Sequence, residues 1–573
     1  MNATKLATTG SKDVRFFHNA GRLHVDTDAT IAAITDAPVE VIATWHTVSR
    51  HGDNRAGVVI NTNKGEQYLD YTITTSSRDL HRALLHLGIH IVGLKTIQGA
   101  TSLNLVQLYI NTATTDETRQ VHTSDGWDST RRFYVAGPRI IPKTPGVVGD
   151  EDVPDPMHIS GSLPDFRASI FANIQDHPGY NWAVSLALGS YLLPFVDIPP
   201  NARGGFHVYG DSTTGKSTML LLANAVTGTH RHGIETWCTT SNALEPIAQS
   251  HNHRLLCLDE MGQAKDPAVV LDAAYKLAQG VGKSRMSASG KLLESYRFDL
   301  MFLSSGEDSF ANTYRSETGK EAFPGQKIRF VDIEWSEDIN PYAGDADFSA
   351  LLESLDTQRG TPGVAFLERL ATMTPETKAE IKAQYKSILA GLCRNIGDPK
   401  AKRVANRFAV CILAAKLAKR WGILPSSWNY DLGPETIFKR WVKTMASADE
   451  SMLAAGRLRD LVDAAITGKK LHEYTVEPNG LFLRSQSNYP IGYYDRTNDI
   501  IQLFPNMLDK VITINPTSVK RALNEAGILR YNDKRKTYKH RMRTLASGTR
   551  KLADSQTQVI NINRKSLGDY LDA

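Results

Sequence analysis

The stretch Gly210-Asp-Ser-Thr-Thr-Gly-Lys-Ser217 decides the fold class of the central part of the chain. It fits the pattern GxxxxGK[ST], and it stands between the strand-like Phe206–Tyr209 and the apolar stretch Thr218–Val226, which predicts a helix. The glycines allow the backbone to wrap a phosphate group, so that amide N–H groups and the helix N-terminus point at it. The alternative, a Gly-rich turn without a ligand, is disfavoured by this order of strand, loop and helix.

The residue types in this loop indicate ATP and Mg²⁺ as ligands. Lys216 is expected to reach the β and γ phosphates, and the Ser217 hydroxyl is expected to ligate the metal ion. The residues expected to contact the nucleotide are Gly210, Asp211, Ser212, Thr213, Thr214, Gly215, Lys216, Ser217 and Thr218.

A second buried strand carries two carboxylates at its end. Four apolar residues, Leu255-Leu-Cys-Leu258, precede Asp259-Glu260, and such a run is typical of a parallel strand that is buried on both faces. Its last residues reach the carboxyl edge of the sheet, where α/β folds bind ligands. Asp259 is expected to hold the Mg²⁺ shell and Glu260 to polarise the attacking water. A plain helix start is the alternative.

A third apolar strand, Phe298-Asp-Leu-Met-Phe-Leu303, leads into Ser304-Ser305. A hydroxyl at the end of a strand beside the loop can hydrogen-bond the attacking water or the γ phosphate, which is the sensor position of oligomeric ATPases. Ser304 and Ser305 are both candidates for that position. The alternative is a serine that only caps the following turn.

Composition excludes several other classes of protein. The chain has 573 residues, of which 41% are hydrophobic and 22% charged, so it is expected to fold into three or four packed domains. Its four cysteines are too scattered for a disulfide framework or a zinc site. The longest apolar stretch, Trp182–Val196, is too short to span a membrane, and we expect a cytoplasmic protein without a membrane partner. A net charge of +5 favours a polyanionic partner only weakly.

Changes in composition along the chain predict five segments. Short β-rich runs with one helix indicate an α+β domain, and a Pro-rich acidic stretch indicates a linker. The expected order is an amino-terminal α+β domain over 1–142, a linker over 143–163, an α/β ATPase core over 164–335, a helical lid over 336–450 and a basic carboxyl-terminal domain over 451–573.

Several blocks of the core together resemble the family catalogued as domain of unknown function 927. These blocks are Gly204–Ser217, Thr240–Glu245, Leu258–Glu260, Gly282–Arg285 and Leu303–Glu307. The family occurs on mobile elements and phages and includes minichromosome-maintenance-like helicases of cassette-chromosome elements. The resemblance implies an AAA+ fold for the core, over about residues 165–335, a ring of six identical subunits, and ATP-driven unwinding or translocation of DNA.

The resemblance also suggests roles for arginines. Arg329, after Gly325-Gln-Lys-Ile328, stands where an arginine finger would enter the neighbouring subunit's site, and Arg315 is the alternative. A guanidinium suits this role because it stays charged and binds phosphate oxygens bidentately. Arg403 and Arg407 lie four residues apart, hence on one helical face, and either could be a lid arginine that contacts the γ phosphate. A merely exposed or paired arginine is the alternative.

Two basic regions are candidates for DNA contacts. Gly282–Lys291 predicts a β-hairpin, which in the resembled ring helicases carries basic residues into the central channel; here these are Lys283, Arg285 and Lys291. The stretch from Lys534 to Lys551 holds eight basic residues and no acid, and its candidates are Lys536, Lys539 and Arg541. It follows a helix expected over Pro516–Ala526 and suggests a winged-helix-like domain with a basic wing. In both regions a solvated surface is the alternative.

These features predict an ATP-dependent hexameric DNA helicase or translocase that acts in the replication of a mobile element or phage. Its expected partners are single-stranded and duplex DNA, identical subunits and other replication proteins. The alternative from another class is a nucleotide-gated DNA-binding initiator or scaffold without processive unwinding. A monomeric phosphate-loop kinase is disfavoured by Arg329 and by the basic hairpin.

Overall fold

The chain forms two compact units in the computed structural model. One unit consists of Met1–Ser309 and Ile328–Glu435, and the other of Phe310–Lys327 and Thr436–Ala573. The described part of the chain is every residue except 1–3, 10–11, 28–29, 49–54, 94–96, 98, 213, 230–232, 238–240, 264–269, 271–274, 284, 287–291, 294, 319–323, 337–338, 340–348, 448–449, 478–479, 489, 513–518, 521–522, 525, 532–538, 542–544, 548–549, 554–556 and 573.

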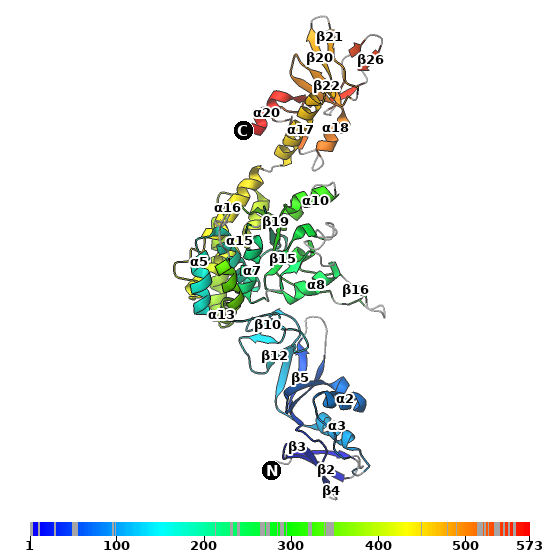
Figure 1. The fold of residues 1–573 in the computed structure, drawn as a ribbon, viewed down its shortest axis with the longest axis vertical. Helices are drawn as coiled ribbons and strands as arrows, with labels where there is room; N and C mark the ends of the chain where they lie inside the picture. Colours follow the sequence, from blue (N-terminus) through cyan, green and yellow to red (C-terminus); the bar gives the residue numbers. More distant parts are fainter. Residues whose placement is uncertain are drawn as a thin grey trace. The chain divides into compact units, whose positions relative to one another are not determined.

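The amino-terminal part of the first unit is built from sheets and three helices (Figure 1). A four-stranded antiparallel meander contains β1 (Thr4–Thr9), β2 (Lys12–Asn19), β3 (Arg22–Thr27) and β4 (Thr30–Ala33). A five-stranded sheet has the order β12-β8-β5-β6-β7, with β5 at Glu40–Val48, β6 at Ala56–Thr62, β7 at Gly65–Asp70, β8 at Thr118–His122 and β12 at Val147–Gly149. The helices are α1 (Tyr71–Thr74), α2 (Ser77–His86) and α3 (Ser102–Thr112). The apolar faces of α2 and α3 join the strands in one core that includes Phe16, Leu80 and Ile110.

The segment 143–163, expected as a linker, is packed against the rest of its unit. Its strand β12 pairs in parallel with β8, and Ser160 bridges to Arg359. The prediction of an unpacked linker was wrong, because acidic residues of this segment form hydrogen-bonded turns. The Asp150 and Asp155 carboxylates accept hydrogen bonds from the backbone N–H groups of Asp152 and Met157, which fixes the chain between its prolines.

A five-stranded parallel sheet forms the centre of the first unit. Its order is β14-β15-β18-β13-β19, with β13 at Gly205–Tyr209, β14 at Glu235–Thr236, β15 at Leu256–Asp259, β18 at Phe302–Gly306 and β19 at Phe330–Glu334. The strands are short apolar runs because parallel strands are covered on both faces. The helix α7 (Lys216–Thr227) follows β13 directly, as the sequence predicts. Strand β18 lies between β13 and β15, so the loop after β13 and the carboxylates after β15 flank the end of β18.

Helices gather beside α7 and cover the sheet (Figure 1). The helix α6 (Pro178–Ser190) is buried along almost its whole length and packs against both α7 and α15 (Pro399–Arg420). Trp182, Phe206 and Phe408 join α6, β13 and α15 through ring contacts with centroids 5.0–6.3 Å apart. The region after the sheet is helical, with α12 at Ser349–Thr357, α13 at Thr361–Ala371, α14 at Pro375–Cys393 and α16 at Leu432–Ser447.

The second unit contains a six-stranded mixed sheet of order β21-β20-β22-β23-β27-β24. The strands are β20 (Leu471–Glu477), β21 (Gly480–Ser485), β22 (Gly492–Asp495), β23 (Ile500–Leu503), β24 (Lys539–Arg541) and β27 (Gln558–Asn563), and the helices around them include α17 (Glu450–Thr467), α18 (Pro505–Val511) and α20 (Arg564–Asp572). The sequence predicted a winged-helix-like domain with a basic wing here, and the described residues form a larger mixed sheet. The basic stretch contributes β24 to it, while β25 (Leu545–Ser547) pairs with β26 (Arg550–Ala553).

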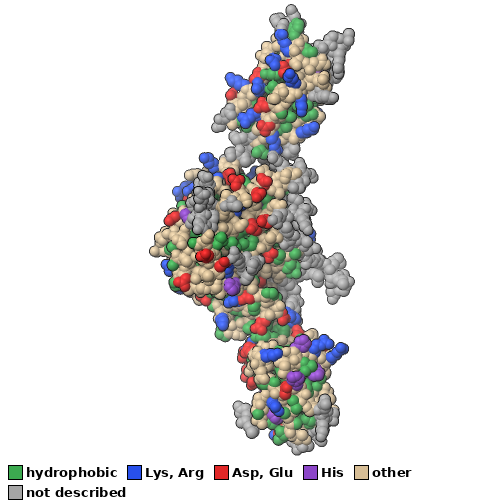
Figure 2. Space-filling model, in the orientation of Figure 1, with side chains coloured by type: hydrophobic (Ala, Val, Ile, Leu, Met, Phe, Trp, Pro, Cys, Tyr) green, Lys and Arg blue, Asp and Glu red, His purple; other side chains and the backbone are tan. Residues whose placement is uncertain are grey.

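Within the described residues, no helix is both long and apolar enough to cross a membrane. On the face shown in Figure 2, Lys and Arg side chains of the second unit are interspersed with Asp and Glu.

Candidate active site

The Gly210–Ser217 loop joins the carboxyl end of β13 to the N-terminus of α7. Gly210 has φ +152° and Gly215, which caps the helix, has φ +89°, so both occupy backbone conformations that favour glycine. The Thr214 hydroxyl donates to the Asp211 carbonyl at 2.8 Å and closes the turn between them. Thr213 lies outside the described residues. The loop therefore lies at the carboxyl edge of the sheet, with glycines at its two positive-φ positions Gly210 and Gly215.

Two aromatic residues for which no role was predicted, Trp335 and Tyr180, hydrogen-bond to backbone carbonyls of the loop. The Trp335 indole N–H donates to the Thr214 carbonyl at 2.7 Å, and the Trp335 backbone N–H donates to the Tyr209 carbonyl at 2.7 Å. The Tyr180 hydroxyl reaches the Gly215 carbonyl at 3.5 Å, and its ring packs on Trp335. In the sequence, Trp335 is recognisable only as a tryptophan directly after an apolar strand. The pairing of β19 with β13 shows that this tryptophan lies beside the loop.

Lys216 is buried at the start of α7, with 8% of its surface exposed. Its ammonium group donates to the carbonyls of Gly210 and Asp211. Burial lowers the pKa of Lys216, whereas the nearby carboxylates of Glu307, Asp211 and Asp259 act in the opposite direction. The charges of these three acids thus favour the cation. No role for Glu307 was predicted, because this residue lies in the turn after β18 and comes near Lys216 only in the folded sheet.

Asp259 and Ser305 meet across neighbouring parallel strands. The Ser305 hydroxyl donates a hydrogen bond to Oδ1 of Asp259, and the backbone N–H of Glu260 donates to the same oxygen at 3.0 Å. Glu260 is exposed and has φ +54°, a left-handed conformation that is uncommon for residues other than glycine. The structure therefore brings Lys216, Asp259, Glu260 and Ser305 to one edge of the sheet.

Ser304 faces the interior, away from this cluster. It is fully buried, accepts a hydrogen bond from the Trp237 indole N–H at 2.8 Å and lies 3.0 Å from Nδ1 of His207. His207 must donate from Nε2 to the Asp308 carbonyl at 2.9 Å, so its Nδ1 accepts the Ser304 proton. Burial lowers the pKa of His207 to about 4. The Ser304 hydroxyl is thus used in the core, and its expected contact with the γ phosphate or the attacking water was wrong.

The oxygen groups expected to hold Mg²⁺ fit that ion. Carboxylate and hydroxyl oxygens are the hard ligands that Mg²⁺ prefers, usually one or two from the protein with the rest from phosphates and water. The Ser217 side chain is exposed, and its hydroxyl has no hydrogen-bond partner among the described residues. Those residues contain no group of three or more His, Cys, Asp or Glu side chains that could form an all-protein metal site.

Arg329 lies at the opposite edge of the sheet from the Gly210–Ser217 loop of its own chain. It directly precedes β19, its carbonyl accepts from Gly205 N–H at 2.9 Å, and β19 runs parallel to β13. A Cβ on Gly204 would stand 2.2 Å from the same carbonyl, so this approach requires glycine. The Arg329 guanidinium lies 4.8 Å from the centre of the Tyr275 ring. The side chain of the alternative, Arg315 on α10 (Phe310–Thr318), lies outside what the structure describes.

Arg407 is a structural residue, and its expected contact with a phosphate was wrong. It is fully buried, its guanidinium donates to the carbonyls of Gly205, Ile328 and Arg329, and it lies 5.0 Å from the centre of the Phe206 ring. These carbonyls belong to the amino edge of the sheet, whereas the loop is at the carboxyl edge. Arg403 is exposed on α15, and its role stays a prediction.

The predicted basic hairpin is present as β16 (Arg285–Met286) and β17 (Leu292–Leu293), with Arg285 opposite Leu293. Lys283 is exposed, and its backbone N–H donates to Glu245. Lys291 lies outside the described residues. In the basic tail, Lys539 and Arg541 belong to β24, and Lys536 is not described.

Residues 24–296 match the family model described as Domain of unknown function (DUF927). The match includes the Gly210–Ser217 loop, Asp259 and Glu260 and ends before Ser305 and Arg329. It also begins far upstream of residue 165, so the similarity takes in most of the amino-terminal region. No curated protein matches the chain.

A solved structure shares the fold of this chain at low sequence identity. A chain described as the active helicase Cch of SCCmec type IV is 15% identical, with a TM-score of 0.65 over 96% of this chain and 98% of that one. This likeness shows a shared mixed α/β fold along nearly the whole chain. The apo structure of the NrS-1 C-terminal region is 12% identical over 66% of this chain and 87% of that one, and its TM-score of 0.28 carries no argument.

Proposed function

We propose that this protein is an ATP-hydrolysing DNA helicase or translocase with an AAA+ core. The observation that carries the proposal is the hydrogen bond from Ser305 to Asp259 beside the Gly210–Ser217 loop. It joins a hydroxyl to a carboxylate at the sheet edge where Glu260 and Lys216 also lie, and this set of groups supports phosphoryl transfer as the reaction. The fold shared with a protein described as an active helicase supports the choice of DNA as the partner.

Each side chain at this edge has a defined task in phosphoryl transfer. Lys216 exchanges its two loop carbonyls for phosphate oxygens, and the Gly210–Ser217 amides surround the same group. Ser217 and Asp259 would hold Mg²⁺, which neutralises charge on the phosphates. Glu260, exposed after its left-handed turn, accepts the proton of the attacking water. Ser305 fixes the orientation of the Asp259 carboxylate.

The active unit is a ring in which Arg329 of one subunit completes the site of the next. Arg329 cannot contact a phosphate bound at the Gly210–Ser217 loop of its own chain, because the two lie at opposite edges of one parallel sheet.

The basic hairpin β16–β17 and the strand β24 contact the DNA backbone. Lys and Arg are suited to this contact because each neutralised phosphate releases counterions. Replication of a mobile element or phage is the process in which we place this activity.

Turnover of ATP by the full chain with and without DNA tests the proposal. A helicase hydrolyses ATP faster with DNA, a scaffold binds DNA without such stimulation, and a kinase transfers phosphate to an acceptor. Replacement of Lys283, Arg285 and Lys291 by Ala should remove the stimulation and leave basal turnover. If DNA does not change the rate of ATP turnover by the wild type, the alternative, a nucleotide-gated initiator or scaffold, is favoured.

A further inference from the structure

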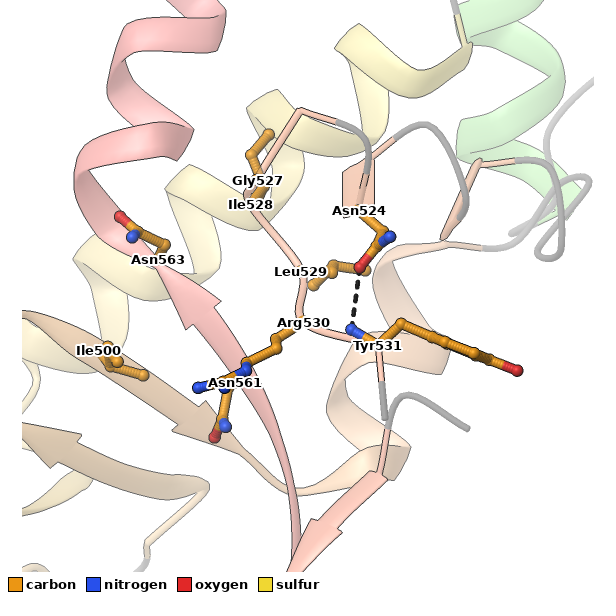
Figure 3. A pocket seen from close by; sticks show the side chains of 9 residues that line it. All are labelled: Ile500, Asn524, Gly527, Ile528, Leu529, Arg530, Tyr531, Asn561 and Asn563. Carbon is orange, nitrogen blue, oxygen red and sulfur yellow. Dashed lines mark hydrogen bonds between the residues drawn. The ribbon is translucent and has the colours of Figure 1, made fainter. Parts of the chain in front are cut away.

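A cavity of about 390 Å³ lies in the second unit, beside the strands β23 and β27 (Figure 3). This volume is within the range of small-ligand sites. Three asparagines, Asn524, Asn561 and Asn563, line it together with Arg530, whose side chain extends toward Asn561 in Figure 3. None of the described residues that line the cavity is acidic.

The side-chain oxygens of two of these asparagines are held by backbone donors. Asn524 Oδ1 accepts from the N–H of Tyr531 at 2.9 Å, and Asn563 Oδ1 accepts from the N–H of Ser566 at 3.0 Å. A backbone N–H group can only donate, so these contacts fix which end of each amide is the oxygen. The NH₂ group of each side chain is the end left over.

Asn561 is oriented by a relay of side chains. The Tyr474 hydroxyl donates to Oε1 of Gln502 at 2.8 Å, and Nε2 of Gln502 donates to Oδ1 of Asn561 at 3.0 Å. The Asn561 NH₂ group therefore also remains as a donor. Arg530 adds an exposed guanidinium that forms no ion pair with any described residue. Apart from the Tyr531 hydroxyl, which can donate or accept, the polar side-chain groups that the described residues leave at this cavity are donors, from three amides and one cation.

Such a set of donors selects for a ligand that only accepts hydrogen bonds and carries negative charge. A phosphate group meets both conditions, and charge-assisted hydrogen bonds to it are the stronger kind. A nucleobase presents donors as well as acceptors and therefore matches this donor-rich set less well than a phosphate does. We infer that the cavity at Asn524, Arg530, Asn561 and Asn563 is a phosphate-binding site. This site goes beyond the proposed function, which assigns DNA contacts to the β16–β17 hairpin and to β24 and gives these four residues no role.

The phosphate could belong to a nucleic-acid backbone or to a free phosphate compound, and two titrations of the full chain separate these sources. The first measures affinity for fluorescent oligonucleotides of two different sequences at several salt concentrations. The second measures thermal stabilisation by inorganic phosphate against chloride at matched ionic strength. Asn561→Asp is the most informative variant, since it keeps the acceptor for Gln502 and replaces a donor by a negative oxygen. Arg530→Gln removes the positive charge and leaves a shorter side chain that still carries an NH₂ donor.

Matched controls make the same charge changes elsewhere in the unit. Asn506→Asp alters an exposed residue of α18, and Arg484→Gln alters β21, which β20 and β22 separate from β23. For a backbone phosphate, Asn561→Asp and Arg530→Gln weaken oligonucleotide binding roughly tenfold and lower the salt slope by up to about 0.9, with either sequence. The two controls leave both quantities unchanged.

For a free phosphate compound, oligonucleotide binding stays the same, and the two cavity variants lose the stabilisation by inorganic phosphate. The inference is overturned if neither titration changes, or if the variants affect one oligonucleotide sequence only, which would indicate contacts to base edges. Neither titration depends on ATP turnover, so failure of the proposed function would leave both results interpretable.

Discussion

Ser305 and Asp259 come from neighbouring parallel strands, 46 residues apart in sequence, and the hydroxyl of the first donates a hydrogen bond to Oδ1 of the second. The same oxygen accepts the backbone N–H of Glu260. The position of the Asp259 carboxylate is therefore fixed from two sides. Its role as a ligand in the proposed ATPase depends on that position.

Replacement of Ser305 by Ala should affect ATP turnover, whereas replacement of Ser304 by Ala should affect the stability of the fold. Ser305→Ala should lower ATP turnover and leave thermal stability nearly unchanged, because the Asp259 carboxylate loses one of its two partners. Ser304→Ala should destabilise the fold by about 1–3 kcal/mol, because Trp237 and His207 lose a partner in the core. Steady-state kinetics and thermal melts of both variants check this. Equal kinetic effects of the two would contradict the assignment.

Hydrolysis should require Arg329 from a neighbouring subunit. Arg329→Ala subunits and Lys216→Ala subunits should each be inactive alone, and a mixture should regain part of the activity, because some interfaces then combine an intact loop with an intact arginine. Turnover is measured against mixing ratio, with size-exclusion chromatography as the control for assembly. Mixtures that assemble and stay inactive would exclude a role in trans.

Arg407 should contribute to stability and not to catalysis directly. Arg407→Met keeps the apolar stem but leaves the carbonyls of Gly205, Ile328 and Arg329 without their donor, which should destabilise the unit by about 3 kcal/mol. Arg403→Met, on an exposed turn of the same helix, is the matched control and should stay within about 0.5 kcal/mol of the wild type. Chemical denaturation measures both. Similar midpoints for the two variants would contradict the structural role.

The stability of the first unit should depend on pH through His207. Burial lowers the pKa of His207 from 6.5 to about 4, so the folded state keeps the ring neutral where the unfolded state binds a proton. The contribution is complete above pH 6.5 and is lost as the pH falls from 6.5 to 4, by about 3 kcal/mol in total. His207→Gln cannot titrate and should flatten this part of the profile in denaturation experiments. An unchanged slope would show that His207 is not the group responsible.

The central strands and the loop could be predicted because their signals are local. The pattern from Phe206 to Val226 contains a strand, a turn and a helix within one stretch, and the structure has β13 and α7 there. The choice between Ser304 and Ser305 could not be made in this way. Adjacent residues of a strand face opposite sides, and which side holds the site depends on the neighbouring strands β13 and β15, which are distant in sequence.

The contacts of Arg407 on α15 could not be predicted from the sequence either. Helical spacing places Arg403 and Arg407 on one face of α15, but it does not say what that face contacts. The segment 143–163 shows that composition alone is also insufficient, since its prolines and acids make fixed turns beside β8 and not a free tether.

Strand displacement from a forked DNA tests the central claim most directly, with the full chain and its Glu260→Gln variant compared at saturating ATP. The wild type should release the labelled strand in proportion to the ATP consumed. The variant should still bind ATP and the fork but release the strand at least about 10²-fold more slowly, because the group that activates water is neutral. Equal rates of release by both proteins, or no release by the wild type while it hydrolyses ATP, would contradict the proposed helicase.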